Sequence, residues 1–197
     1  MELGGPPGKR ESQSARRHSN RPPLEEDQTR MTALAHRTTS AARNPLDIVE
    51  EIVSANEWTF QRSGDDELSV DFPGHWCSYH LHFVWSEDLS AMHLSCFMDM
   101  KVPKKRFTPV AELLALINNR LWLGAFVLPA EESTPVFRHT VLLRGAQGAS
   151  VEQLEDMVDI ALTECERFYP AFQFVTWGGK TAEEAIAASL LETVGEA

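Results

Sequence analysis

Apolar and polar residues alternate in three consecutive stretches near the middle of the chain. The stretches cover residues 68–72, 77–85 and 92–98, and each has an apolar side chain at every second position. Successive side chains of a β-strand point to opposite faces, so this period of two gives each strand one apolar and one polar face. The pattern predicts an antiparallel sheet that is covered on its apolar face only. Trp58 and Phe60 indicate a further strand before these three.

Two helices are predicted from an N-cap residue that stands directly before a proline. Asn44 has this position ahead of apolar residues at helical spacing, and its helix is expected to end near Asn56. Thr108 stands before a second proline, and its helix is expected to stop at Gly124. A side-chain oxygen that accepts from a free backbone N–H stabilises a helix start, and proline fits the first helical position.

Two more helices are predicted from capping boxes, in which a hydroxyl residue and a Glu or Gln three residues later bond each other's backbone N–H groups. Ser150 and Gln153 begin the longer helix, and Pro170 is expected to interrupt or restart it. Thr181 and Glu184 begin a short, alanine-rich terminal helix. Both helices have apolar residues along one stripe, so each is expected to pack against the sheet.

A second hairpin is predicted between the second and third helices. It joins residues 125–128 to residues 136–143 through a polar turn at 129–135. The resulting order is helix, strands, helix, hairpin and long helix. This order predicts an α+β fold, with an antiparallel β-sheet and helices packed on one side of it.

The composition divides the chain of 197 residues at about residue 43. Residues 1–43 are rich in Gly, Pro, Ser and Arg and have a net charge of +3, whereas residues 44–197 have a net charge of −14. A segment with so few large apolar residues buries too little surface to offset the entropy of ordering. We predict a disordered basic N-terminal tail, 1–43, followed by an α+β domain, 44–197. An alternative is that Met31 is the true first residue, which would remove most of the tail.

The acidic domain bears on the choice of partner and location. Its charge repels phosphate backbones, so we expect no nucleic-acid binding by the folded part. No apolar run approaches the ~20 residues that span a bilayer, and the N-terminus lacks the pattern of a signal peptide. We therefore expect a cytoplasmic protein without membrane contact, whose partner is another protein. A weaker alternative is that the basic tail binds nucleic acid or an anionic membrane.

The three cysteines predict neither a disulfide framework nor a common zinc site. Cys77, Cys96 and Cys165 are odd in number, widely spaced and free of CxxC pairs. Free cysteine is among the most frequently buried residue types. We expect buried, reduced thiols and no cofactor.

The polar positions of the predicted strands contain histidines that two hairpin registers would bring together. A tight turn at 86–89 places His82 opposite His93, and a turn at 73–76 places Glu67 beside His82. Cross-strand neighbours lie ~5 Å apart at Cβ, close enough for two imidazoles and a carboxylate to share a metal ion or to titrate together. An ordinary polar face is the preferred interpretation. The alternative is a metal-binding or pH-sensing protein, or an enzyme, that uses these three residues.

No stretch of the chain has a recognised catalytic signature. His139 lies between Arg138 and Thr140 without a serine or cysteine motif, so it fits an ordinary strand residue. Residues 178–181 (GGKT) resemble the end of a phosphate loop but lack the first glycine at the required spacing. They fit a helix end followed by a new N-cap. We therefore expect no catalytic residue and no metal ligand.

Five aromatic residues near predicted helix ends are expected in the core, and some of them are candidates for a dimer seam. They are Trp122, Phe126, Phe168, Phe172 and Trp177.

Four strings in the C-terminal part of the chain resemble the YbjN family of bacterial proteins. They are FRHT at 137–140, VLLRG at 141–145, YPAF at 169–172 and WGGK at 177–180. The resemblance, which extends from about residue 44 to the end, implies a small α+β domain like that of type III secretion chaperones. It also implies a regulatory or protein-binding role and a possible homodimer, because such chaperones commonly pair and wrap extended client segments. The expected function is a non-enzymatic, chaperone-like or regulatory protein-binding module, for which the family supplies no catalytic residue.

Overall fold

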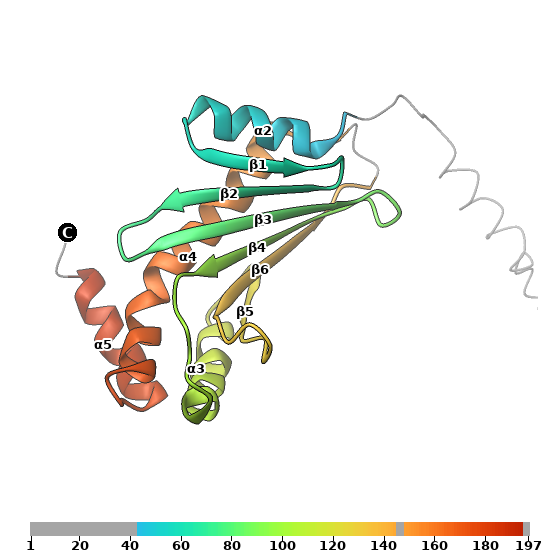
Figure 1. Cartoon of the computed structure of the whole chain (residues 1–197). Coiled ribbons are helices and arrows are strands. Elements are labelled where there is room, and N and C mark those ends of the chain that lie inside the picture. The colour runs from blue at the N-terminus through green and yellow to red at the C-terminus, as the bar shows by residue number, and fades with distance from the viewer. Residues whose placement is uncertain (1–42, 145–147, 195–197) are drawn as a thin grey trace, which may run out of the picture. The chain divides into compact units, whose positions relative to one another are not determined.

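The computed structural model describes residues 43–144 and 148–194, and within them four α-helices and six strands follow one another (Figure 1). The helices are α2 (Pro45–Ala55), α3 (Phe107–Asn118), α4 (Val151–Thr176) and α5 (Ala182–Val194), and one 3-10 turn, η1 (Lys104–Arg106), precedes α3. The strands are β1 (Thr59–Ser63), β2 (Glu67–Pro73), β3 (Ser78–Ser86), β4 (Ala91–Met98), β5 (Ala125–Val127) and β6 (Val136–Leu142).

The six strands form one antiparallel sheet in the order β1-β2-β3-β4-β6-β5. The first four strands are a meander, and the β5–β6 hairpin adds to it with β6 against β4. The structure confirms the three alternating strands, the later hairpin of β5 and β6, and the additional first strand, β1. The helices pack on one face of this sheet, so the predicted α+β fold class is confirmed as well.

The covered face of the sheet is a continuous apolar layer beneath α4. One row across the strands consists of Val70, Leu81, Cys96, Phe137 and Phe126, which are neighbours in the strand pairing. Each of these residues is at most 1% exposed. In Figure 1, α4 runs behind the strands and crosses them. The buried residues of α4 and this row belong to the same hydrophobic core.

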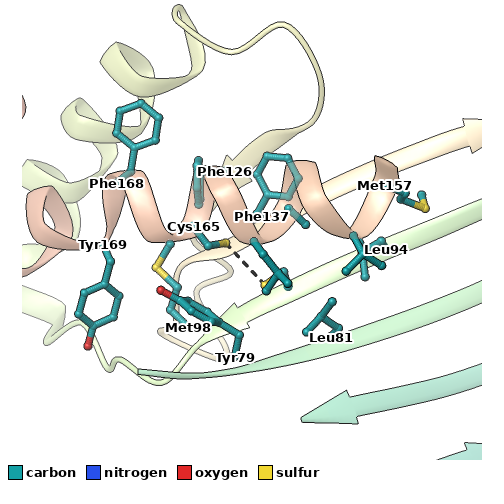
Figure 2. Packing of buried hydrophobic residues seen from close by; sticks show 14 of the residues in the cluster. Tyr79, Leu81, Leu94, Met98, Phe126, Phe137, Met157, Cys165, Phe168 and Tyr169 are labelled. Carbon is teal, nitrogen blue, oxygen red and sulfur yellow. Dashed lines mark hydrogen bonds between the residues drawn. The ribbon is translucent and has the colours of Figure 1, made fainter. Parts of the chain in front are cut away.

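Aromatic rings join the β5–β6 hairpin to α4. The Phe126 ring lies 5.2 Å from that of Phe137, 6.1 Å from that of Phe168 and 5.4 Å from that of Phe172. Edge-to-face and tilted ring pairs at such distances add to the gain from burial alone. Figure 2 shows Phe126 and Phe137 side by side near α4. Phe126, Phe168 and Phe172 are therefore core residues, as predicted.

The long helix α4 begins as predicted but does not break at its proline. Gln153 N–H donates to Ser150 Oγ at 3.2 Å, and Ser150 N–H donates to Gln153 Oε1 at 3.0 Å. The prediction that Pro170 interrupts or restarts the helix is wrong, because α4 continues to Thr176. An interior proline costs about 3 kcal/mol. Its buried neighbours Tyr169 and Phe172 offset this cost, since burying one large apolar side chain gains roughly 1.5–3 kcal/mol.

The second helix is shorter than predicted at its C-terminal end. It starts at Phe107 after η1 rather than at a Thr108 cap, and it ends at Asn118 instead of Gly124. Gly124 lies in the loop before β5 with a φ of +69°, where a Cβ would come within 2.3 Å of the Phe137 ring. The glycine is therefore needed for a close approach to the core and not as a helix stop.

The first and last helices begin as predicted. Asn44 Oδ1 accepts from Leu46 N–H at 2.9 Å, and α2 ends at Ala55 with Asn56 as its C-cap. Glu184 N–H donates to Thr181 Oγ1 at 3.2 Å, and Thr181 N–H donates to a Glu184 carboxylate oxygen at 3.0 Å. Residues 178–181 are thus a helix end and a new N-cap, which confirms that interpretation.

The predicted tail lies outside the described residues except for Arg43, and so does Met31. Among the helices of residues 43–144 and 148–194, none is long and apolar enough to cross a bilayer.

Candidate functional site

The sheet face turned away from the helices, called the open face below, is the main candidate site. Strand pairing places alternate residues of all six strands on it. They include Thr59, Gln61, Ser63, Glu67, Ser69, Asp71, His80, His82, Val84, His93, Ser95, Phe97, Arg138, Thr140 and Leu142, and also the small or apolar residues Ala91, Ala125, Val127 and Val136. Most of them are polar, so the alternation in the sequence correctly predicted the character of both faces.

The predicted row of Glu67, His82 and His93 does not form, because both hairpin registers were wrong by two residues. His82 pairs with Ser69 and Ser95, while His93 and Glu67 both pair with Val84. Each turn contains four residues, 74–77 and 87–90, between the last paired positions. A shift of two residues keeps every side chain on its face, so the three residues still share the open face in a staggered arrangement.

The histidines of the open face contact different partners. His82 Nε2 lies 3.7 Å from a Glu67 carboxylate oxygen. His93 hydrogen-bonds Thr140 Oγ1 at 2.7 Å through Nδ1 and Ser95 Oγ at 3.1 Å through Nε2. His82 thus contacts strand β2, whereas His93 is held between β6 and a residue of its own strand β4.

A third histidine lies one row further along the open face. His80 Nδ1 is 2.8 Å from Asp71 Oδ1. This pair lines a shallow hollow of about 340 Å³ together with Phe97, Lys101 and Thr134. The Lys101 ammonium donates to Thr134 Oγ1 at 2.9 Å, so the hollow combines a carboxylate, a cation and an aromatic edge.

The surroundings of His93 favour its neutral form. Partial burial lowers its pKa below the ordinary value, and the positive charges of Arg138, His82 and His139 lower it further. A neutral imidazole has one donor and one acceptor nitrogen, which suits the two hydroxyl partners. The centre of the open face is therefore uncharged at His93 near neutral pH.

The geometry gives no support to a metal site. In residues 43–144 and 148–194, no group of three His, Cys, Asp or Glu side chains is arranged to hold a metal ion. The two-residue shift separates the His82–Glu67 pair from the hydroxyl-bonded His93. The open face is a hydrogen-bonding surface on which His80, His82 and His93 each have a different partner.

Two tryptophans that were expected in the core lie on the surface. Trp122 is 99% exposed and Trp177 is 59% exposed. Trp122 lies in the loop between α3 and β5, beyond the early end of α3, whereas Trp177 is the C-cap of α4. Leu142, at the end of β6, adds an apolar side chain that is 69% exposed to the open face.

Asn118 is a structural residue that the sequence did not reveal. Its amide binds both backbone groups of Phe126 in the edge strand β5, as donor to the carbonyl at 3.0 Å and as acceptor from the N–H at 2.8 Å. An edge strand whose backbone groups are occupied does not pair with a further strand at that point. In the sequence, Asn118 lies inside the helix predicted from Thr108 to Gly124, so no local signal marked it as a contact to a strand.

The remaining candidate residues lie beneath the sheet. His139 is in β6, as predicted, and pairs with Leu94 on the covered face, where burial lowers its pKa. The Cys165 thiol donates to the Cys96 sulfur at 3.6 Å, and both cysteines are buried (Figure 2). Cys77 is only half-buried, so the prediction of buried, reduced thiols holds fully for two of the three.

Comparisons with protein families and with solved structures each find a relative of the chain. The model of the YbjN family, described as "Putative bacterial sensory transduction regulator", matches residues 45–174. The solved structure titled "Crystal structure of YbjN, a putative transcription regulator from E. coli" is 15% identical with a TM-score of 0.45, covering 60% of this chain and 84% of that chain. No curated protein matches the chain.

Proposed function

The chain belongs to the YbjN family of bacterial regulators, and we propose that it is a non-enzymatic regulatory module that binds another protein on the open face. Binding of an extended client segment, as secretion chaperones do, is the finer form of this proposal. The open face is broad enough for such a segment because it extends across six strands.

The observation that supports this proposal is the contrast between the two faces of the sheet. Helices bury one face, and among the described residues no helix packs on the other. An uncovered face with histidines, hydroxyls and the exposed Leu142 offers both hydrogen bonds and apolar contact to a partner. Because Asn118 occupies the backbone groups of Phe126, we expect the partner on the face of the sheet and not at the edge strand β5.

A second candidate function is pH sensing on the same face. It is favoured by His93, whose neutral ring bonds Thr140 and Ser95 and whose pKa is lowered. Protonation below the ordinary histidine range would place a new positive charge beside Arg138 and remove an acceptor. A partner bound at neutral pH would then be released in acid.

Site-specific photo-crosslinking in the native host tests the proposal. A photoreactive amino acid is placed at Gln61 or Thr140, which are exposed on the open face. The control positions are Glu155 and Asp159, which are equally exposed on α4. We expect the same partner to be crosslinked from both open-face positions and from neither control position.

Charge reversal at Arg138 and insertion of a charge at Leu142 provide the matched loss-of-binding variants, since both residues are exposed. Arg138→Glu and Leu142→Arg are expected to remove the crosslink while the thermal unfolding midpoint stays unchanged. Crosslinks that come from α4 and not from the sheet contradict the proposal. Crosslinks of the chain to itself from the open face assign the face to a homodimer instead.

A further inference from the structure

Basic residues gather at one place on this acidic domain. Residues 44–197 contain ten Lys or Arg against 24 Asp or Glu. Four of the ten lie around the C-terminal end of α4, together with an exposed tryptophan. The group, called the basic patch below, consists of Lys104, Lys105, Arg106, Trp177 and Lys180.

Hydrogen bonds hold the two segments of the basic patch together. The Arg106 guanidinium donates from Nε to the Val175 carbonyl at 2.8 Å and also from Nη2 to the same oxygen. Lys180 N–H donates to the Phe174 carbonyl at 3.1 Å, and its ammonium lies 5.1 Å from the centre of the Phe174 ring. The turn η1 and the residues after α4 are therefore neighbours, although they are about 70 positions apart in the sequence.

Helix capping accounts for only part of this charge. Cations near the last turn of a helix bind its free carbonyls and favour its dipole, which explains Arg106 and Lys180. Lys104 and Lys105 are exposed and have no ion pair with any residue of 43–144 or 148–194. Trp177 stands two residues after Val175, whose carbonyl binds Arg106, and exposes 59% of its surface.

We propose that the basic patch docks a short acidic segment of a partner protein, with Trp177 in contact with an apolar or aromatic residue of that segment. Two unpaired ammonium groups supply the attraction to carboxylates, and an exposed indole supplies the contact area typical of interface hot spots. The basic patch is separate from the open face, so this proposal does not depend on whether the open face binds a partner.

The charge around the basic patch favours a short segment over an extended polyanion. Charges interact over about 8–10 Å at physiological ionic strength. A duplex or an anionic bilayer would approach the surrounding acidic surface as well, which is part of a domain with a net charge of −14. A short acidic peptide meets only the local charge. The nearby Glu184 carboxylate is occupied at the start of α5, where it accepts from Thr181 N–H.

The test measures binding of a short fluorescein-labelled peptide of glutamate residues with one central tryptophan to the full chain, by fluorescence anisotropy. The charge reversal K104E/K105E is compared with R120E/R144E, which changes the net charge equally at two exposed arginines elsewhere. Trp177→Ala is compared with Trp122→Ala, because both tryptophans are exposed. Thermal unfolding confirms that all four variants fold.

We expect K104E/K105E to lower the affinity for the peptide at least about tenfold and Trp177→Ala to lower it severalfold. Both control variants should bind the peptide like the parent protein. The affinity should fall as salt rises. Equal losses in K104E/K105E and R120E/R144E would overturn the proposal, since they report net charge alone. It is also overturned if a single-stranded oligonucleotide or anionic vesicles bind the same patch more tightly than the peptide.

Discussion

The side chain of Asn118 binds both backbone groups of Phe126. The amide nitrogen donates to the Phe126 carbonyl at 3.0 Å, and the amide oxygen accepts from the Phe126 N–H at 2.8 Å. One side chain thereby replaces the neighbouring strand that β5 lacks. It also connects the end of α3 to the edge of the sheet, at a residue whose ring is buried in the core.

Replacement of Asn118 by alanine is expected to lower the free energy of unfolding by about 2 kcal/mol, because two backbone groups in a partly buried position lose their partners. Chemical denaturation with urea measures this change. The matched control is Asn119→Ala, the next residue, whose side chain is exposed. The interpretation fails if both variants lose the same stability.

The same variant also tests the protection of the sheet edge. An edge strand with free N–H and C=O groups is a template for pairing with another chain. Asn118→Ala is therefore expected to self-associate at high concentration, as measured by sedimentation velocity. Asn119→Ala is expected to sediment like the parent protein.

Acid is expected to destabilise the protein through His93 and His139. Burial lowers the pKa of both residues below 6.5 in the folded state. The unfolded chain then binds more protons below pH 6.5, so their contribution to stability is complete above that pH and is lost as the pH falls. The slope reaches at most about 1.4 kcal/mol per pH unit for each group.

The double variant His93→Gln with His139→Gln isolates this contribution. Its free energy of unfolding should fall less steeply than that of the parent between pH 6.5 and acid pH, since neither glutamine titrates. Denaturation curves at a series of pH values measure the two slopes. Parallel slopes would assign the acid sensitivity to carboxylates instead.

The period of apolar residues determined the faces of the sheet but not the pairing of its strands. The alternation assigned His82, His93 and Glu67 to one face correctly, yet both predicted four-residue turns began one residue too early, which shifted each strand pairing by two residues. Ser90, with a φ of +47°, is the last residue of the observed turn between β3 and β4. A serine in that conformation is uncommon, so nothing local in the sequence predicts it.

The limits of helix prediction have a similar physical origin. Cap residues such as Ser150 act on their own neighbours, and these local signals were correct. Pro170 and Asn118 depend on residues distant in sequence, because burial against the sheet sustains the first and the β5 backbone binds the second. The exposed position of Trp122 follows from the early end of α3 at Asn118 and was therefore missed too.

A side chain at position 74, now Gly74, is expected to destabilise the protein. A Cβ at this position would lie 2.2 Å from the Tyr79 ring and 2.4 Å from a Glu166 carboxylate oxygen. That carboxylate accepts the His75 N–H at 2.7 Å, so it is held in place. Gly74→Ala should cost about 1–3 kcal/mol through overpacking, measured by urea denaturation.

Gly179 is the control that separates overpacking from backbone strain. Its φ is +69° and a Cβ would meet nothing within 4 Å, so Gly179→Ala should cost only about 1 kcal/mol. If Gly179→Ala is the more damaging of the two, the tight contact at Gly74 is relieved by movement of the turn.

The thiols are expected to divide into one reactive and two protected groups. Burial raises the pKa of both Cys77 and Cys165, but Cys77 is half-buried while Cys165 and Cys96 are enclosed between α4 and β4. The thiolate is the reacting form and needs access to the reagent. Iodoacetamide at pH 8 should therefore modify Cys77 slowly and leave the other two thiols intact.

Peptide mapping by mass spectrometry measures the three labelling rates with and without denaturant. In the folded protein, Cys96 and Cys165 should be labelled at the same low rate, because the contact between their sulfurs breaks only when α4 leaves the sheet. Addition of urea should raise both rates together. Labelling of Cys165 ahead of Cys96 would mean that α4 opens locally, and the long helix would then be a mobile element instead of a fixed support for the sheet.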